Sequence, residues 1–250
     1  NPNEIDTALE VLNGLQNWKL NAYSGSLNVN SSNNNGLTYV DNASKSDNND
    51  WFYDENGYAY FKTYPGNATS SGSNNPRTEL RELTTNGSNN INWDGTTNTE
   101  HIMKWKVRVD NLPPSGKLCF GQIHAESGSP FDDVIRVQVQ GNNGQNSGAV
   151  TLRINGYVTE ELLGSGQSVS SFNFNMNTDY YFELTMKNSI VTLYELNDNG
   201  LRVNTLFTSG ATASTGNYFK AGCYLQTTLS SHSSSSTYGL VGISALSVSH

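Results

Sequence analysis

The chain has 250 residues, of which 35% are hydrophobic and 14% are charged, and its formal net charge is -8. General nucleic-acid binding requires a basic face, which an acidic chain lacks, so we expect no nucleic-acid partner. No apolar run approaches the roughly 20 residues of a membrane span, so we expect no membrane insertion. Charged residues are scarce, and the chain is instead rich in uncharged polar residues and Gly. Turns favour Asn, Ser and Gly, whereas strands favour Tyr, Phe, Val and Thr. The composition predicts a turn-rich, all-β protein, and the length suits a single domain over residues 1–250.

The first element is a short N-terminal helix. Ile5, Ala8, Leu9 and Leu12 fall at i, i+3, i+4 and i+7, which is the spacing of one helical face. Gly14 stands where a helix favours a left-handed residue at its end. No other segment gives a convincing helical pattern.

From Trp18 onward the hydrophobic period is two, in short runs between Gly, Asn, Ser and Pro clusters. This pattern is typical of β-sandwiches and jelly rolls. The low-complexity stretches are predicted to be surface loops, and they cover residues 24–36, 67–75, 208–217 and 227–237.

One predicted strand covers residues 102–109 and alternates strictly. Successive side chains of a strand point to opposite faces, so one set lies inward and consists of Met103, Trp105, Val107 and Val109. The other set is predicted to be a solvated face rather than a substrate-binding stripe, and it consists of Lys104, Lys106 and Arg108.

Three further runs carry polar side chains on one face. These polar rows are Arg77, Glu79 and Arg81, then Gln122 and His124, then Tyr218, Lys220, Tyr224 and Gln226. The opposite face of the last run is apolar, with Phe219, Ala221, Cys223 and Leu225. If the rows line one concave sheet, they form a cationic groove in an acidic protein. Arg binds carboxylates through two parallel hydrogen bonds, and Tyr rings suit sugars, so the groove suits a polyuronate.

Such a polymer is cleaved without water by β-elimination, in which the C5 proton leaves and the bond to O4 breaks. The C5 proton is acidic enough only when the neighbouring carboxylate is neutralised, and Arg77 and Gln122 are candidates for this role, with His124 as a third. A base must reach C5 and an acid must protonate O4. His124 and Tyr224 are the candidates, as two residues or as one Tyr acting on both sides, and a groove lined by Arg and Lys favours tyrosinate.

These motifs resemble those of the alginate lyases of polysaccharide lyase family 7. The resemblance lies in Arg77-Thr78-Glu79-Leu80-Arg81, in Gln122-Ile123-His124 and in residues 218–226, and Asn17-Trp18-Lys19-Leu20 is similar to the family's first strand. It implies a β-jelly roll of two antiparallel sheets with the substrate groove on the concave one. It also implies an alginate lyase that needs no obligatory cofactor or metal.

By motif position, the resemblance assigns the catalytic roles to Arg77, Gln122, His124 and Tyr224. It assigns substrate binding to Glu79, Arg81, Tyr218, Lys220 and Gln226. In the family, Ile between Gln and His tends to accompany activity on guluronate-containing blocks, so Ile123 favours poly-guluronate or mixed alginate. The expected product ends are 4,5-unsaturated uronates from endolytic cleavage. We further expect a secreted monomer, and the start of this chain shows no signal peptide.

Three other functions stay open. A lyase acting on another polyuronate, such as glucuronan, would use the same chemistry. A carbohydrate-binding module on the same fold would keep the aromatic and Arg residues but would not need His124 and Tyr224 together. A glycoside hydrolase requires paired carboxylates, whereas Glu79 and Glu82 fall on opposite faces of their strand.

The remaining chemically interesting residues carry weaker predictions. The two cysteines, Cys119 and Cys223, fit no metal-binding spacing. Both are predicted to face inward and to be free rather than joined in a disulfide. Several acidic residues are predicted to lie in solvated loops rather than to bind calcium, namely Asp47, Asp50, Asp54, Asp132 and Asp133. Three histidines show no matched partner, namely His101, His232 and His250, and His232 is a candidate to reach the groove from its Ser-rich loop.

Overall fold

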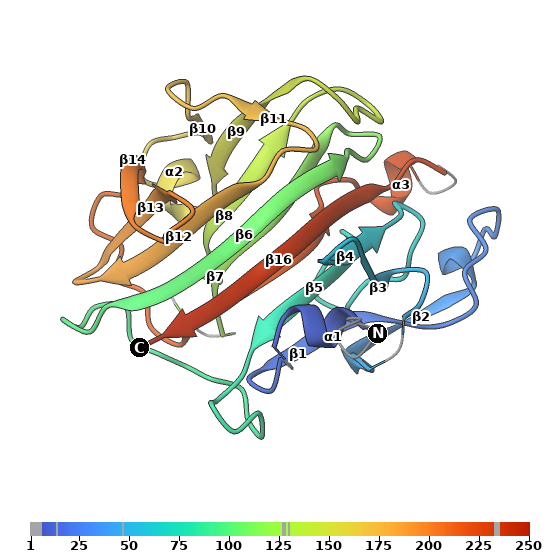
Figure 1. Cartoon of the computed structure of the whole chain (residues 1–250), viewed down its shortest axis with the longest axis horizontal. Helices are drawn as coiled ribbons and strands as arrows, with labels where there is room; N and C mark the ends of the chain where they lie inside the picture. Colours follow the sequence, from blue (N-terminus) through green and yellow to red (C-terminus); the bar gives the residue numbers. More distant parts are fainter. Residues whose placement is uncertain (1–6, 14, 47, 127–128, 130, 233–235) are drawn as a thin grey trace.

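The computed structural model describes residues 7–13, 15–46, 48–126, 129, 131–232 and 236–250, which form two stacked antiparallel sheets (Figure 1). The expected all-β sandwich is therefore confirmed. The inner sheet, which carries the site, has the order β10-β9-β8-β7-β15-β5-β1-β2, with β11 beside β9. Its strands are β1 (Trp18–Gly25), β2 (Leu37–Ala43), β5 (Arg77–Glu82), β7 (Lys117–Ala125), β8 (Asp133–Gln140), β9 (Ala149–Asn155), β10 (Gln167–Ser168), β11 (Phe174–Asn175) and β15 (Asn217–Leu225).

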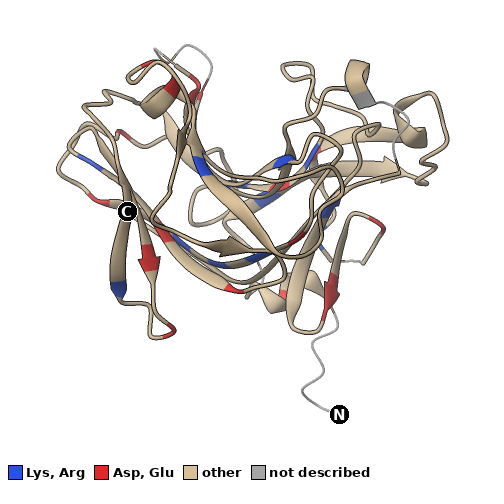
Figure 2. Ribbon diagram, turned by 90° about the horizontal axis from the view of Figure 1, so that it is seen from above, with Lys and Arg blue, Asp and Glu red and all other residues tan. Residues whose placement is uncertain are grey.

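The outer sheet has the order β14-β13-β12-β6-β16-β4-β3. Its strands are β3 (Phe52–Glu55), β4 (Tyr58–Thr63), β6 (His101–Asn111), β12 (Tyr180–Lys187), β13 (Ile190–Leu196), β14 (Arg202–Thr208) and β16 (Gly239–Ser249). Viewed from above, the sheets curve in the same direction, and basic residues lie along the curved strands (Figure 2). This curvature gives the inner sheet the concave face that the sequence analysis assumed.

The hydrophobic core lies between the two sheets. Trp105 of β6, Phe120 of β7 and Phe182 of β12 are fully buried there. The Phe182 ring centroid lies 5.6 Å from that of Trp105 and 5.9 Å from that of Phe120. Burial of each such ring contributes about 1.5–3 kcal/mol to folding, so these rings hold the inner sheet in place against the outer one.

The helices are short. They are α1 (Ala8–Val11), α2 (Tyr157–Glu160) and α3 (Leu229–His232), together with a 3-10 turn, η1 (Asn34–Gly36). The predicted N-terminal helix is present as α1, and Thr7 caps it by accepting a hydrogen bond from the backbone N–H of Glu10. Ile5 and Gly14, on which that prediction also relied, lie outside the described residues. No described helix has the length and apolarity to cross a membrane.

Each of the four predicted surface loops contains buried residues, so those predictions are wrong in part. Thr212 and Ser214 are fully buried, and the Ser214 hydroxyl donates to the Asn217 side chain over 2.6 Å. Asn67 is also buried and accepts a hydrogen bond from Asn35 over 2.8 Å. Polar residues can be buried here because their side chains form hydrogen bonds with one another.

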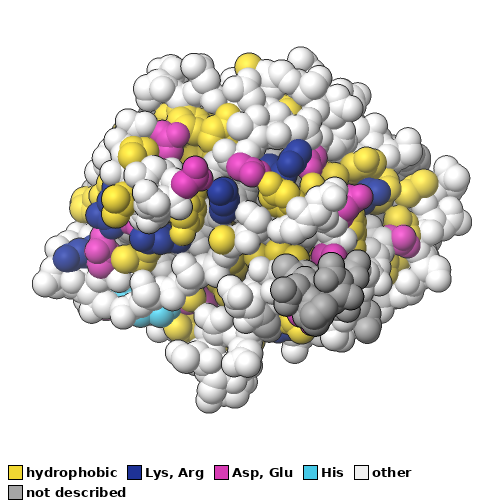
Figure 3. All heavy atoms as spheres, in the orientation of Figure 1, with side chains coloured by type: hydrophobic (Ala, Val, Ile, Leu, Met, Phe, Trp, Pro, Cys, Tyr) yellow, Lys and Arg dark blue, Asp and Glu magenta, His cyan; other side chains and the backbone are white. Residues whose placement is uncertain are grey.

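Strand β6 alternates as predicted, and its inward residues are all fully buried. Its three basic residues face away from the groove, on the outer sheet. They are paired there with acidic residues: Lys104 with Glu183, Lys106 with Asp198, and Arg108 with Asp110. Basic and acidic side chains accordingly lie together on this face (Figure 3). The stripe is thus part of the outer surface and cannot contact a ligand in the groove.

Candidate active site

The structure brings the three polar rows together on neighbouring strands of the inner sheet. Strand β15 lies between β5 and β7. In the β-ladder, Tyr224 is opposite Arg77, while Lys220 is opposite Gln122 and Tyr218 is opposite His124. Directly opposed residues share one face of a sheet, so the rows form a single polar surface. The alternate residues of β15 are in the hydrophobic core, as predicted: Phe219, Ala221, Cys223 and Leu225.

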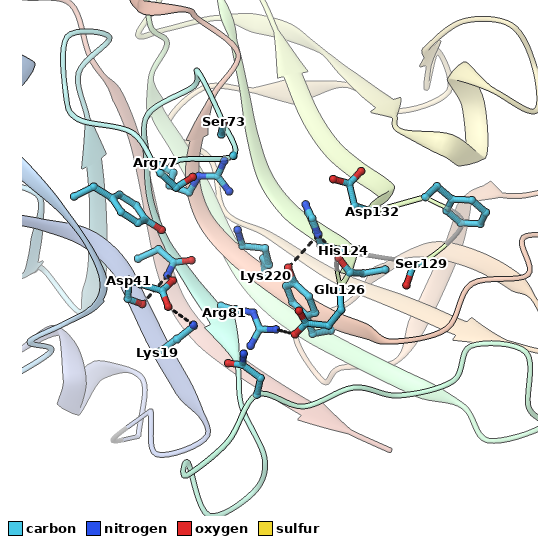
Figure 4. Close-up of a pocket in the computed structure, with 18 residues that line it drawn as sticks. Lys19, Asp41, Ser73, Arg77, Arg81, His124, Glu126, Ser129, Asp132 and Lys220 are labelled. Atoms are coloured by element: carbon cyan, nitrogen blue, oxygen red, sulfur yellow. Dashed lines mark hydrogen bonds and ion pairs between the residues drawn. The ribbon is translucent and has the colours of Figure 1, made fainter.

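Two adjoining cavities open on this surface. The smaller one measures about 170 Å³ and is lined by all four predicted catalytic residues: Arg77, Gln122, His124 and Tyr224. The larger one measures about 610 Å³ and is lined by Arg81, Tyr218 and Lys220 among others. Arg77 and His124 line both cavities, which makes them one continuous groove (Figure 4).

Glu79 lies beneath the groove and joins three of the predicted site residues. Its carboxylate is 1% exposed, accepts a hydrogen bond from the Gln122 side chain over 2.8 Å, and lies 3.2 Å from Nη1 of Arg77. It also forms an ion pair with Lys220. Burial alone would raise the pKa of Glu79, but Lys220 and Arg77 hold that pKa below its ordinary value. Glu79 is therefore a buried carboxylate that fixes the groove cations, and it lines neither cavity.

His124 is held by its Nδ1 atom. Nδ1 lies 2.9 Å from the backbone oxygen of Ala125 and 3.0 Å from the hydroxyl of Tyr218. A backbone oxygen only accepts, so the Nδ1 hydrogen points to it and the lone pair of the neutral ring is on Nε2. Burial, together with the charge of Lys220, lowers the pKa of His124 to about 4. The ring is therefore neutral at pH 7, and Nε2 can act as a base.

Tyr218 and Tyr224 lie near the two ends of β15. Tyr224 is therefore on the other side of the small cavity from the Tyr218–His124 pair. Its ring packs against the guanidinium of Arg77, with 4.2 Å between the guanidinium carbon and the ring centroid. Its hydroxyl lies 3.4 Å from the hydroxyl of Ser73. Ser73, on the loop before β5, lines both cavities and was not singled out in the sequence.

The cations of the larger cavity are also held in place. The guanidinium carbon of Arg81 lies 3.8 Å from the ring centroid of Tyr218, and Arg81 is paired with Glu126. Lys220 is almost fully buried, and this burial lowers the pKa of its ammonium to about 8 although Glu79 opposes the shift. Lys220 thus stays largely charged at neutral pH.

Gln226, predicted to bind substrate, lies at the end of β15 and lines neither cavity. Its side-chain oxygen is 3.5 Å from Nη1 of Arg136. Arg136 itself lines the small cavity and was missed in the sequence. The signal was available, because Arg136 and Gln138 alternate with Ile135 and Val137 along β8.

Asp133 is not the solvated loop residue that we predicted, whereas Asp132 is exposed in the bend before β8, as predicted. Both line the small cavity, and Asp133 is the first residue of β8, directly opposite His124. Burial raises the pKa of Asp133 to about 6 although Arg136 opposes the shift. Of the other residues in that prediction, Asp50 is exposed in a bend as expected, Asp54 lies half-buried in β3, and Asp47 lies outside the described residues.

The two cysteines are free and lie on opposite faces of the inner sheet. Cys223 is in the hydrophobic core, as predicted. Cys119 is opposite Tyr224 and Gln138 on the groove side, so its predicted inward orientation is wrong. The reason is an irregularity of β7 between Cys119 and Gly121, which shifts the alternation by one residue.

Two histidines that we expected to lack partners have them. Nε2 of His250 lies 2.6 Å from the buried carboxylate of Glu82, and Nδ1 of His250 lies 2.8 Å from Nδ1 of His101. Glu82 also accepts hydrogen bonds from Trp93 and from the backbone of Phe219. This cluster lies on the face opposite the groove. The side chain of His232 lies outside the described residues, and no group of three or more potential metal ligands occurs in the described part of the chain.

Fixed cations, a neutral histidine with a free Nε2 and a tyrosine in one open groove are the features of a carbohydrate-active β-sandwich that acts on an acidic polysaccharide. A family model described as "Alginate lyase" matches residues 13–250. The chain thus belongs to the alginate lyases of polysaccharide lyase family 7, and the family resemblance inferred from the sequence is confirmed.

Solved structures agree with this assignment. The marine alginate lyase AlyA1 from Zobellia galactanivorans is 36% identical over 98% of this chain and 100% of its own, with a TM-score of 0.81. The alginate lyase from Corynebacterium sp. is 26% identical over 99% of this chain and 100% of its own, with a TM-score of 0.74. Alginate lyase A1-II' has been solved with a product, GGG, at 22% identity over 98% and 99% of the two chains and a TM-score of 0.68, a likeness that shows the fold alone. Among curated protein sequences there was no match.

Proposed function

We propose that this protein cleaves the 4-O-glycosidic bonds of alginate by β-elimination and leaves 4,5-unsaturated uronate ends. The observation that carries the proposal is the arrangement of the small cavity. Arg77 and Gln122 are both fixed by Glu79, and they share the cavity with His124 and Tyr224. Family membership supports a polysaccharide lyase, and the chain's relatives include alginate lyases.

In the proposed reaction, the uronate carboxylate binds between Arg77 and Gln122. Their N–H groups stabilise the charge that develops when the C5 proton leaves. Nε2 of His124 takes this proton, and the electron pair of the C5–H bond forms the C4–C5 double bond. The C4–O4 bond breaks, and the Tyr224 hydroxyl protonates O4. Proton exchange with water then restores neutral His124 and Tyr224.

We also propose endolytic cleavage with a preference for guluronate-containing blocks. A continuous open groove suits a polymer that extends beyond both sides of the cleavage point. The block preference rests on Ile123, which is fully buried under the groove between Gln122 and His124. Such a side chain would act by setting the position of the backbone that carries its two neighbours.

A hydrolase is the less favoured alternative. Hydrolysis of a glycosidic bond uses a pair of carboxyl groups that face the substrate. The two glutamates considered for such a pair do not face the groove: Glu79 is occupied by three donors beneath it, and Glu82 is bonded to His250 and Trp93 on the other face. We further propose that the protein acts as a secreted monomer, because an alginate polymer is encountered outside the cell.

Mass spectrometry of the products tests this proposal. The protein is incubated with poly-guluronate, poly-mannuronate and glucuronan in the presence of a chelator. We expect oligosaccharides of several lengths early in the reaction with poly-guluronate, each lighter by one water than the product of hydrolysis. Products of hydrolytic mass would refute β-elimination, and products from glucuronan alone would move the substrate to that polymer. Release of one short product from the start would refute endolytic cleavage.

A further inference from the structure

The groove cations are paired with carboxylates of two different kinds. Arg77 and Lys220 share Glu79, whose side chain is 2% exposed. Breaking a buried pair leaves an uncompensated charge in the protein and costs several kcal/mol. These pairs are therefore fixed, and they remain when a ligand enters the groove.

Three other cations are paired with carboxylates on the rim of the groove. The Lys19 side chain is 11% exposed and its partner Asp41 is 66% exposed. Arg81 is 7% exposed and its partner Glu126 is 37% exposed. The same asymmetry holds for Arg136, at 17%, and Glu160, at 41%. In each pair the cation belongs to the inner sheet and the carboxylate reaches it from the exposed rim.

These cations stand in one row across the sheet. Lys19 is opposite Arg81, and Arg81 is opposite Lys220. Lys220 is opposite Gln122, which in turn is opposite Arg136. Neighbouring strands are about 4.8 Å apart, so the row spans about 19 Å perpendicular to the strands. The rim carboxylates thus meet the cations on both sides of the cavity that holds His124 and Tyr224.

We propose that the rim carboxylates Asp41, Glu126 and Glu160 stand in for the carboxylates of the substrate, which replaces them on the groove cations when it binds. The inference deepens the proposed function and rests on it, because it requires a polyuronate as the ligand. Glu126 is the clearest case. Its partner Arg81 is also held by the ring of Tyr218, so the guanidinium keeps its position when Glu126 leaves.

The energetics favour such an exchange. In each pair the carboxylate is exposed, so water solvates it once it is released; a pair made by such an exposed carboxylate contributes only about 0–1 kcal/mol. A uronate carboxylate can take over the charge of the released side chain, and it can accept two parallel hydrogen bonds from a guanidinium. A neutral polysaccharide has no charge with which to replace the rim carboxylate. It would have to leave a buried cation unpaired, or bind with the rim carboxylate still in place. The rim carboxylates therefore act as competitors that lower the affinity for every ligand and exclude uncharged ones.

The test is the sign of the effect of Glu126→Gln. The substitution is made in a Tyr224→Phe background, and the Kd of a guluronate tetrasaccharide is measured by calorimetry. We expect the Kd to fall about two- to five-fold, the factor that corresponds to the loss of one exposed ion pair. In the otherwise unchanged protein, Glu126→Gln should lower the KM for poly-guluronate by a similar factor.

A matched control is Asp198→Asn, which removes the exposed partner of Lys106 on the outer sheet. It should leave the Kd and the KM unchanged. If Glu126 instead serves to position Arg81, its removal will raise the Kd, and an unchanged or raised value therefore overturns the inference. If the parent protein neither binds the tetrasaccharide nor forms unsaturated products, the proposed function fails and the inference fails with it.

Discussion

Gly222 of β15 lies directly opposite Glu79 of β5, and the absence of a side chain at residue 222 lets the backbones of the two strands approach closely at this point. A Cβ atom at this position would come within 2.6 Å of the Cα of Glu79 and within 2.7 Å of the backbone oxygen of Thr78. The φ angle of Gly222 is +143°, a value that side chains of L residues rarely adopt. The close approach of these two strands is what brings Glu79 within reach of Lys220 and Gln122.

Replacing Gly222 with Ala should therefore destabilise the fold. We expect the free energy of unfolding to fall by about 1–3 kcal/mol, the usual cost of forcing extra atoms into a packed site. Denaturant unfolding measures this. Gly164→Ala is the matched control, because Gly164 also has a positive φ, of +82°, but has no atom within 4 Å of the added Cβ. Equal losses for the two variants would show that the contact with Glu79 carries no energy.

Glu79→Gln should reduce both activity and stability. The substitution keeps the size of the side chain but leaves Arg77 and Lys220 without their buried counter-charge. We expect kcat/KM on alginate to fall at least about 100-fold, comparable with the loss of one oxyanion-stabilising donor. Glu195→Gln, which changes an exposed carboxylate bonded to Asn204 on the outer sheet, is the control. Activity within two-fold of the unchanged protein would exclude Glu79 as the residue that fixes the groove.

The pH dependence of kcat/KM should reflect the lowered pKa of His124. Protonation removes the base, so the acidic limb should lie near pH 4 and not near the ordinary histidine value of about 6.5. The free energy of unfolding also depends on pH through His124. Between about pH 6.5 and 4 the unfolded chain holds more protons at this residue than the folded one, so stability falls as the pH falls through that window. An acidic limb near pH 6.5 that disappears in His124→Gln would contradict the lowered pKa.

Ligand affinity should weaken on the alkaline side through Lys220. The pKa of its ammonium is lowered to about 8, so the groove loses a cation as the pH rises through that value. We expect the Kd of a guluronate oligosaccharide, measured in a Tyr224→Phe background, to rise between pH 7 and 9. Lys220→Arg keeps its charge in this range and should show a flat profile. The same rise in Lys220→Arg would assign the effect to another group.

Much of the site could be predicted because strand alternation depends only on local sequence. The run 218–226 shows which residues face the groove and which face the core, and the structure agrees from Tyr218 to Leu225. The three motifs were also specific enough to indicate the family. The catalytic and binding roles themselves stay predictions until they are measured.

The errors have physical causes that act over long distances. The irregularity in β7 that turns Cys119 toward the groove depends on how β7 pairs with β8 and β15, and not on residues next to it. The bond between His250 and Glu82 joins residues 168 positions apart in the chain. The charges around Arg136 come from Asp133, at the start of the same strand, and from Glu160 of α2, and the pairing with Glu160 has no local signature.

The central claim is that Tyr224 and His124 perform β-elimination on alginate. The most direct measurement is the ultraviolet absorbance of the 4,5-unsaturated uronate during incubation with poly-guluronate, because hydrolysis does not form this conjugated group. We predict a steady rise with the unchanged protein, none above background with Tyr224→Phe, and oligosaccharide binding by Tyr224→Phe that is largely intact. A rise of equal rate with Tyr224→Phe, or no rise with the unchanged protein on any polyuronate, would contradict it.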